Sequence, residues 1–240
     1  MLRLGWICII SLPFILYYLW KVGYIERHSR RYSEAKRYRI ARRMIRIMKH
    51  NGMIHTKVYG TDHLPAEGGY VMYANHQGKY DSLSIIGAHK KPCTVVMDEK
   101  RSHLFLADQF ITLLKGTRLD KSSMKNQLNS IMKVINEVKD GRRYIIFPEG
   151  GYEHNHNNVN DFMPGAFKCA MRAKSPIVPV ALIDSYKPFE LNSLKPVTTQ
   201  VHFLEPLYYE DYKGMSTKEV SEIVKNLIVD TITQYSTSPS

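Results

Sequence analysis

Cysteine is scarce in this chain, and its placement excludes two classes of small domain. The three cysteines, Cys8, Cys93 and Cys169, show no C-x-x-C spacing and no paired arrangement. Disulfide frameworks and structural zinc sites both require cysteines in such pairs. The sequence therefore predicts neither, and it favours a reducing compartment.

Surplus charge is nearly absent from most of the chain, although the whole carries +12. Residues 1–50 hold twelve of the 34 Lys and Arg residues but only two of the 22 acidic ones, which gives this segment +10 and the remainder +2. A nucleic-acid-binding domain spreads its basic residues over the fold, so nucleic acid is not indicated as a partner. A basic segment at one end is typical of an element that meets a phospholipid membrane.

A hydrophobic run of full membrane-spanning length is also missing. The apolar run from Leu4 to Trp20 has seventeen residues, or about 25 Å as a helix, which is short for a bilayer. A cleaved signal peptide is the alternative, but no small-x-small cleavage site follows the run. We expect an uncleaved anchor or a half-inserted hairpin. The dense positive charge after it predicts that the body lies on the cytoplasmic side of the cell membrane.

Residues 29 to 49 read as a basic amphipathic helix. Apolar residues cover one arc of a helical wheel and basic residues the opposite arc, with Arg37 out of place (apolar Ile40, Ala41, Met44, Ile45, Ile47 and Met48; basic Lys36, Arg39, Arg42, Arg43, Arg46 and Lys49). Such a helix lies in a headgroup region with its apolar face down. The alternative is a helix packed on the body with a solvated basic face. We place a boundary here: residues 1–50 form a membrane anchor and amphipathic helix, and residues 51–240 form the main domain.

After residue 53, expected strands alternate with expected helices. The strands are Ile54–Tyr59, Tyr70–Ala74, Pro92–Met97, Arg143–Phe147, Ile177–Ile183 and Gln200–Leu204; the helices are Asp81–His89, Leu104–Leu114, one capped by Ser122 or Ser123 and closed by Gly141, Gly165–Ala173, and one opened by the capping box Ser216–Glu219. This alternation predicts an α/β fold with a mostly parallel sheet flanked by helices, plus the membrane-associated helical segment at the N-terminus. Pro176 and Pro179 favour an edge strand. Residues 236–240 are expected to be disordered.

A His and an Asp follow the strand Tyr70–Ala74 with a glycine between them. In Asn75-His76-Gln77-Gly78-Lys79-Tyr80-Asp81, Gly78 lets the backbone turn, so that the carboxylate of Asp81 can accept the Nδ1–H of His76. The free Nε2 can then take a proton from an alcohol. No serine nucleophile lies beside this pair, which indicates that a substrate hydroxyl is the attacking group. The alternative is a capped strand–helix turn with a satisfied histidine.

Further stretches occur in a fixed order with this pair. They are Gly116-Thr117-Arg118-Leu119-Asp120-Lys121, Tyr144-Ile145-Ile146-Phe147-Pro148-Glu149-Gly150, Phe162-Met163-Pro164-Gly165-Ala166-Phe167 and Pro176-Ile177-Val178-Pro179-Val180. The ordered set resembles the glycerolipid acyltransferase family, most closely the 1-acylglycerol-3-phosphate acyltransferases. His76 and Asp81 fill its H-x4-D motif, and Phe147 to Gly150 fill its F-P-E-G motif. The resemblance covers about residues 55 to 210.

The resemblance implies transfer of a fatty acyl group from a thioester, of coenzyme A or of acyl carrier protein, to the hydroxyl of a lysophospholipid. His76 would be the general base and Asp81 would orient it, with no metal or other cofactor. We expect backbone N–H groups after Asn75 to stabilise the oxyanion. Glu149 and Gly150 would bind the glycerol phosphate end of the acceptor, and a structural ion pair is the alternative role of Glu149. The full set expected to bind substrate is Asn75, Arg118, Lys121, Phe147, Pro148, Glu149, Gly150 and Gly151.

The sequence departs from the family at two phosphate-gripping positions. Many members have Thr-Arg after F-P-E-G, where this chain has Gly151-Tyr152, and Asp120-Lys121 replaces Asp-Arg. Lysine keeps the charge but loses the bidentate fork of arginine, so Arg118, or Lys168 and Arg172 on a later helix, are candidate substitutes. The acceptor is therefore lysophosphatidic acid or another lyso-lipid. A non-catalytic membrane-surface binding protein on the same fold is the remaining alternative.

A run of metal-ligand residue types, Glu153-His154-Asn155-His156, follows the F-P-E-G motif. It lies in a polar, Asn-rich stretch without hydrophobic framing. We interpret it as a solvated loop or a substrate flap rather than a metal site.

Overall fold

A seven-stranded sheet organises the chain in this computed structural model, which describes residues 2–104 and 106–236. Its strands are β1 (Ile54–Tyr59), β2 (Tyr70–Ala74), β3 (Thr94–Asp98), β4 (Thr117–Leu119), β5 (Arg143–Ile146), β6 (Ile177–Ile183) and β7 (Val197–Phe203). They lie in the order β1-β7-β6-β2-β5-β3-β4. Every neighbouring pair is parallel except β6 and β7. The expected mostly parallel α/β sheet is confirmed.

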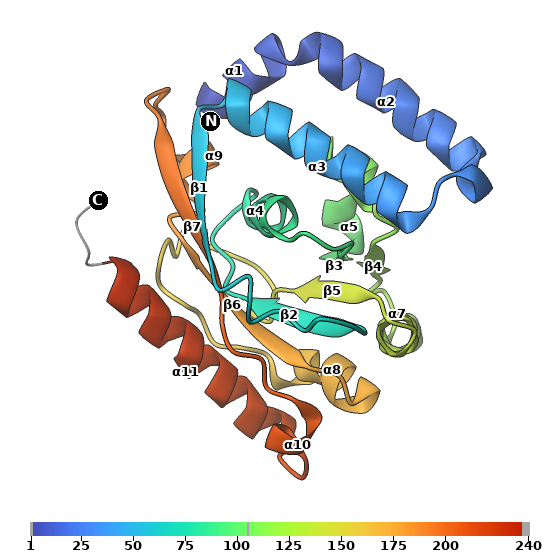
Figure 1. Cartoon of the computed structure of the whole chain (residues 1–240), viewed down its shortest axis with the longest axis vertical. Helices are drawn as coiled ribbons and strands as arrows, with labels where there is room; N and C mark the ends of the chain where they lie inside the picture. Colours follow the sequence, from blue (N-terminus) through green and yellow to red (C-terminus); the bar gives the residue numbers. More distant parts are fainter. Residues whose placement is uncertain (1, 105, 237–240) are drawn as a thin grey trace.

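Helices cover both faces of this sheet (Figure 1). They are α1 (Leu2–Ile10), α2 (Leu12–Arg27), α3 (Glu34–Asn51), α4 (Asp81–Ala88), α5 (Glu99–Ser102), α6 (Ala107–Leu113), α7 (Met124–Lys139), α8 (Lys168–Ala173), α9 (Lys187–Glu190), α10 (Tyr209–Tyr212) and α11 (Thr217–Ser236), with 3₁₀ turns η1 (Ser29–Arg31) and η2 (Pro164–Phe167). Successive side chains of a strand point to opposite faces. Tyr70, Met72 and Ala74 of β2 therefore join a core with α2, α3, α4 and α6. Val71 and Tyr73 join a core with α7, α8 and α11.

Local helix signals in the sequence are confirmed by the caps. The Ser123 hydroxyl accepts the N–H of Asn126 at the start of α7, and Ser216 and Glu219 exchange hydrogen bonds at the start of α11. The helix expected over Leu104–Leu114 is shorter, because α6 begins at Ala107. Of the tail expected to be disordered, Ser236 ends α11 and residues 237–240 lie outside the described part of the chain.

The edge-strand expectation for the proline-containing strand is wrong, because β6 lies between β7 and β2. Pro179 is tolerated there because the antiparallel ladder with β7 begins only at Val180, opposite Phe203. On that side Pro179 offers only its carbonyl oxygen, which accepts the N–H of Leu204. The missing proline N–H therefore falls just before the first paired residue of the ladder between β6 and β7.

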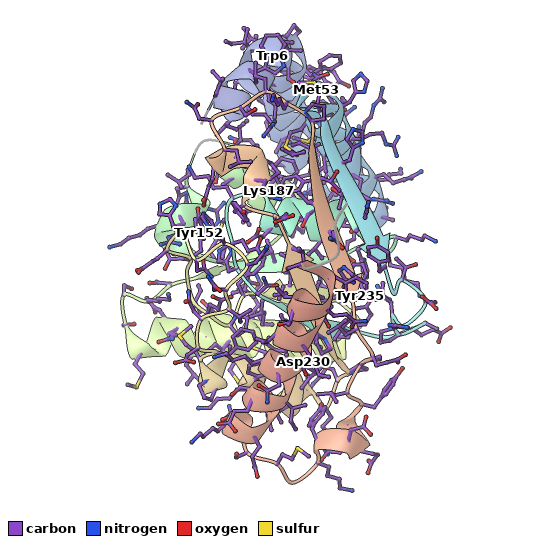
Figure 2. All side chains as sticks on the ribbon, turned by 90° about the vertical axis from the view of Figure 1, so that its left-hand side faces the viewer. Trp6, Met53, Tyr152, Lys187, Asp230 and Tyr235 are labelled. Carbon is purple, nitrogen blue, oxygen red and sulfur yellow. The ribbon has the colours of Figure 1, made fainter. Side chains whose placement is uncertain are left out.

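The N-terminal apolar run forms two helices rather than one. Among the described residues no single helix combines the length and apolarity needed to cross a bilayer, but α1 and α2 meet that test together as a pair bent by 75°. Arg3 is fully buried, and its guanidinium donates to the carbonyl oxygens of Lys187, Pro188 and Lys195. These bonds fasten α1 to α9. Trp6 of α1 lies at the far end of the molecule (Figure 2).

The amphipathic helix forms as α3, but its apolar face packs on the protein. Tyr38, Ala41 and Ile45 are buried in the core together with residues of α4. Arg37, out of place on the helical wheel, is buried and paired with Glu26 of α2. The structure therefore agrees with the alternative in which the basic face alone looks outward. The division into two domains at residue 50 stays a prediction.

Candidate active site

The candidate residues gather at the carboxyl ends of the parallel strands. His76 follows β2, Phe147 and Glu149 follow β5, and α5 follows β3 directly. The strands β2, β5 and β3 are neighbours in the sheet, so their ends converge. In open α/β sheets this edge is where ligands bind.

His76 and Asp81 meet as the sequence predicts. The Nδ1 of His76 lies 2.7 Å from Oδ2 of Asp81. A carboxylate accepts, so this contact assigns the proton to Nδ1 and leaves the lone pair on Nε2. The His76 side chain is 17% exposed and that of Asp81 is 0% exposed. A buried carboxylate thus orients an imidazole that solvent and substrate can reach.

Asp81 also closes the turn that carries His76. Its Oδ2 accepts the N–H groups of Gln77 at 2.5 Å and Gly78 at 2.8 Å. The N–H of His76 donates to Oε1 of Glu149 at 2.7 Å. The expectation that N–H groups at this turn stabilise an oxyanion is therefore wrong for these three, because each already donates to a carboxylate.

Two aromatic rings fix the plane of the His76 imidazole. Phe147 stacks on it with ring centroids 4.3 Å apart, and Tyr152 meets it edge-on at 4.6 Å. Tyr152 stands at the position where the Thr-Arg pattern after F-P-E-G has its arginine. Phe147 thus contacts the expected base itself, and its role in substrate binding stays a prediction.

Glu149 is tied into the protein by both carboxylate oxygens. Oε1 accepts the His76 N–H, and Oε2 accepts the N–H of Asn160 at 3.0 Å and lies 3.3 Å from Nδ2 of Asn155. Burial raises the pKa of the Glu149 carboxyl to about 7, opposed by the N–H groups of His76 and Asn160. These contacts assign Glu149 a part in holding His76, and phosphate binding by Glu149 stays a prediction.

Three other residues expected to bind substrate shape the walls of the site. The amide of Asn75 is buried and exchanges two hydrogen bonds with the backbone of Leu182. The carbonyl of Pro148 accepts the N–H of Met163. Gly150 has φ +75°, and a Cβ there would lie 2.6 Å from Cε of Met163. Only glycine fits this turn without strain.

The expected phosphate-binding bases are held by acids near the same edge. Arg118 donates to Asp108 at 2.7 Å and to the hydroxyl of Ser102. Lys121 lies 3.5 Å from Asp98. The alternatives Lys168 and Arg172 belong to α8, which packs with α7 against the opposite face of the sheet from α3 and α4. None of the four is placed against His76 by these contacts.

Sequence reasoning missed Arg101 of α5. Its guanidinium lies 5.9 Å from the ring centroid of Tyr152. A Cβ on Gly151 would stand 3.8 Å from both of its terminal nitrogens. Within residues 2–104 and 106–236 this guanidinium has no carboxylate partner and no hydrogen bond. Arg101 comes three residues after the end of β3, which neighbours β5 in the sheet, and no spacing in the sequence signals that these two strand ends meet.

The Glu153–His156 stretch runs over the site as a loop. His154 and His156 both approach Oε2 of Glu190 in α9, at 3.4 and 3.3 Å. In the described part of the chain no group of three or more His, Cys, Asp or Glu side chains is arranged to hold a metal ion. In Figure 2 the loop with Tyr152 lies beside α9, which carries Lys187.

Comparisons with known proteins agree with this architecture. The sequence profile of the family described as Acyltransferase matches residues 55–183, more than half of the chain. The 1-acyl-sn-glycerol-3-phosphate acyltransferase of Saccharomyces cerevisiae is 27% identical over 83% of this chain and 67% of that protein. The alpha form of this enzyme from Homo sapiens is 26% identical over 83% and 71%.

A solved structure shares the whole fold. The crystal structure of the 1-acyl-sn-glycerophosphate (LPA) acyltransferase PlsC from Thermotoga maritima superposes with a TM-score of 0.76 at 18% identity, covering 98% of this chain and 99% of that one. At this identity the likeness shows the fold alone. Together with the profile match over residues 55–183, it leaves one conclusion: this chain belongs to the acyltransferase family.

Proposed function

We propose that this chain is a membrane-bound O-acyltransferase that moves a fatty acyl group from a thioester to the sn-2 hydroxyl of lysophosphatidic acid, giving phosphatidic acid. The donor is acyl-CoA or acyl carrier protein. One observation carries the proposal: the Nδ1 of His76 is 2.7 Å from Asp81, while Nε2 has no hydrogen bond with a described residue. The names of the relatives support this acceptor.

The reaction uses His76 twice. Its Nε2 removes the proton of the acceptor hydroxyl as the oxygen attacks the thioester carbonyl carbon, and Asp81 stabilises the resulting imidazolium. When the tetrahedral intermediate collapses, the carbon–sulfur bond breaks and the departing thiolate takes the proton from His76. Because a thiolate leaves readily, this route needs no covalent enzyme intermediate and no metal.

An apolar cavity offers a place for the fatty acyl chain. Residues of α1, α2, α3 and α6 line it, among them Leu4, Ile7, Phe14, Met44 and Phe110. Leu4 and Ile7 also belong to the apolar cluster that contains Tyr80, which directly precedes Asp81. The cavity wall therefore adjoins the turn that carries the dyad.

Arg101 is the residue that grips the acceptor phosphate in this proposal. Its unpaired guanidinium lies against Gly151 and Tyr152 and thereby supplies, from α5, the charge that the Thr-Arg of relatives supplies after F-P-E-G. A charged hydrogen bond contributes about 1.5–3 kcal/mol. We therefore expect Arg101→Ala to raise KM for lysophosphatidic acid about 10- to 100-fold, and Arg101→Lys to raise it less because lysine lacks the fork.

The phosphate-free acceptor monoacylglycerol separates this role from general damage. Arg101→Ala should leave kcat/KM for monoacylglycerol within about twofold of the unmodified protein, since that acceptor presents no anion. Arg172→Ala, an exposed arginine on α8, is the matched control. An equal loss on both acceptors would rule out phosphate recognition by Arg101.

Attachment to the cell membrane, with the catalytic domain on the cytoplasmic side, is supported by the N-terminal helices. The side chains of Arg39, Arg43 and Arg46 on α3 are exposed. The bent pair α1–α2 exposes Ile9, Leu16 and Trp20. Basic residues near an anionic surface contribute about 1 kcal/mol each, and exposed apolar side chains favour the interface.

Charge reversal at these three arginines tests the attachment. The triple variant R39E/R43E/R46E should lower the partition coefficient onto vesicles containing phosphatidylglycerol by at least about two orders of magnitude, from about 1 kcal/mol per residue. Binding should also weaken with added salt. Lys213→Glu with Lys218→Glu, exposed on and beside α11 at the other end of the protein, is the control. Equal binding of both variants would argue against α3 as the docking surface.

The proposed function as a whole is tested by product identification. The detergent-solubilised protein, a labelled long-chain acyl thioester and lysophosphatidic acid should give phosphatidic acid by mass spectrometry. If a product forms only with another lyso-lipid, that lyso-lipid is the acceptor. The replacement of Thr-Arg by Gly151-Tyr152 would then explain the change of acceptor. No product with any lyso-lipid would favour the non-catalytic binding protein.

A further inference from the structure

Glu149 and Asn155 hydrogen-bond to the backbone N–H and the backbone carbonyl of His76. The N–H of His76 donates to Oε1 of Glu149 at 2.7 Å. The carbonyl of His76 accepts from Nδ2 of Asn155 at 3.2 Å, and the same Nδ2 lies 3.3 Å from Oε2 of Glu149. His76 is thus held on its backbone from both sides, independently of the Asp81 contact to its ring.

The orientation of the Asn155 amide is fixed by its partners. Nδ2 faces three oxygens, those of His76, Glu149 and the carbonyl of Asn158 at 2.7 Å. A carbonyl oxygen in its place would meet only acceptors, so the nitrogen must point this way. Asn155 therefore acts at this site as a donor.

The loop that carries Asn155 is pinned on both sides of it. His154 and His156 both lie within 3.4 Å of Glu190, and His156 stacks on Tyr186 with ring centroids 4.1 Å apart. Both histidines have φ +51°, the left-handed region that costs a non-glycine residue about 1–2 kcal/mol. Backbone strain of this kind persists where surrounding contacts over-determine it, and it clusters at functional sites.

The next asparagine of the loop holds the next residue of the turn. Asn157 Oδ1 accepts from Nε2 of the buried Gln77 at 2.9 Å and from the N–H of Asp184 at 2.9 Å. Asn157 Nδ2 donates to the Asp184 carboxylate at 3.1 Å. The loop therefore fixes the position of His76 and Gln77 relative to the end of β6.

We propose that Asn155 is a positioning residue: together with Glu149 it clamps the backbone of His76 and so sets where the imidazole Nε2 meets the acceptor hydroxyl. This inference rests on the function proposed above. A displacement of about 1 Å in a reacting group can cost about 10²-fold in rate. The contact of Asn155 to His76 is made to the backbone carbonyl and not to the imidazole, so Asn155 acts on the reaction through the placement of His76.

The experiment compares Asn155→Ala with Asn158→Ala. Asn158 lies in the same loop with an exposed side chain, and its contact to Asn155 is through its carbonyl, which alanine keeps. Asn155→Ala should lower kcat about 10- to 100-fold, with KM for donor and acceptor within about twofold. Asn158→Ala should match the unmodified protein. Equal kcat in the two variants would overturn the proposal.

The pH profile gives a readout that a merely structural asparagine would not move. Burial raises the pKa of the Glu149 carboxyl to about 7. The charge of His76 lowers this pKa and the charge of Asp81 raises it. Only its ionised form keeps two pure acceptor oxygens, so kcat should rise with pH through about 7. Removing the Asn155 donor favours the neutral acid and should move this limb to higher pH. Asn155→Asp keeps the side-chain shape but adds a carboxylate that repels Glu149, so it should move the rise of kcat to still higher pH. If kcat rises at the same pH in both variants as in the unmodified protein, Asn155 does not hold Glu149 and His76 as proposed.

A spectroscopic readout keeps this test separate from the proposed activity. The Nδ1–H proton resonance of His76, identified by its absence in His76→Ala, reports the imidazole whether or not the protein turns over. Asn155→Ala and Asn155→Asp should shift or broaden it, and Asn158→Ala should not. If the unmodified protein were inactive on every lyso-lipid, the proposed function would fail, and this resonance alone would decide the clamp. An unchanged resonance in both Asn155 variants would refute the proposal that Asn155 positions His76.

Discussion

His76→Ala should lower kcat about 10²- to 10⁴-fold, the range that a positioned general base contributes. The substitution removes the imidazole, whose Nε2 carries the solvent-reachable lone pair of the dyad. The fold should survive, because the contacts of His76 to Glu149 and Asn155 are made by its backbone and alanine keeps both. The measurement is the initial rate of phosphatidic acid formation, with the unfolding midpoint of each protein recorded beside it.

His55→Ala is the matched control for this experiment. His55 lies on the edge strand β1 with its side chain exposed, and only its carbonyl accepts a hydrogen bond in the described structure. It should retain full activity. Residual activity of His76→Ala within tenfold of this control would mean that another group takes the proton. If the unfolding midpoint falls strongly in His76→Ala but not in His55→Ala, His76 is instead a structural residue whose hydrogen bonds stabilise the turn.

What the sequence could predict here is local or nearly so. The strand Tyr70–Ala74 ends where a five-residue buried run ends, and five positions of separation across a glycine bring His76 and Asp81 together. Both facts need only neighbouring residues. The mostly parallel sheet also follows from the order of strands and helices, because parallel strands require crossovers.

What the sequence could not predict depends on contacts between distant segments. Arg101 and Gly151 are fifty positions apart, and Asn155 reaches the backbone of His76 across seventy-nine. No periodicity or spacing reports such a meeting. The interior place of β6 was missed for a related reason: proline favours an edge, and only the register with β7 shows that the antiparallel ladder begins after Pro179, at Val180.

The roles expected for the turn after Asn75 and for Glu149 show the same limit. Free N–H groups at a turn are natural oxyanion donors, but three of them donate to Asp81 and Glu149. The sequence shows which backbone N–H groups a turn contains, but it does not show which oxygens accept their hydrogen bonds. Glu149 follows the adjacent strand β5, and its contact to the N–H of His76 is one that no spacing in the sequence reports.

Asp81→Asn should lower kcat about as strongly as His76→Ala, by roughly 10²- to 10⁴-fold. The asparagine oxygen can take the place of Oδ2 and still accept from Nδ1 of His76 and from the N–H groups of Gln77 and Gly78. The geometry is therefore kept while the negative charge that stabilises the imidazolium is lost. The other oxygen, Oδ1, is buried without a partner, so the new NH₂ breaks no existing bond.

Comparison with Asp81→Ala separates the charge from the scaffold. Alanine leaves the buried N–H groups of Gln77 and Gly78 without an acceptor, at about 1–3 kcal/mol each, so its unfolding midpoint should fall well below that of Asp81→Asn. Asp230→Asn, an exposed carboxylate on α11 (Figure 2), controls for the loss of one charge and should be fully active. If Asp81→Asn keeps near-normal kcat while Asp81→Ala loses it, Asp81 serves the turn and not the chemistry. If both lose kcat but only Asp81→Ala loses stability, the buried charge is what makes His76 a base.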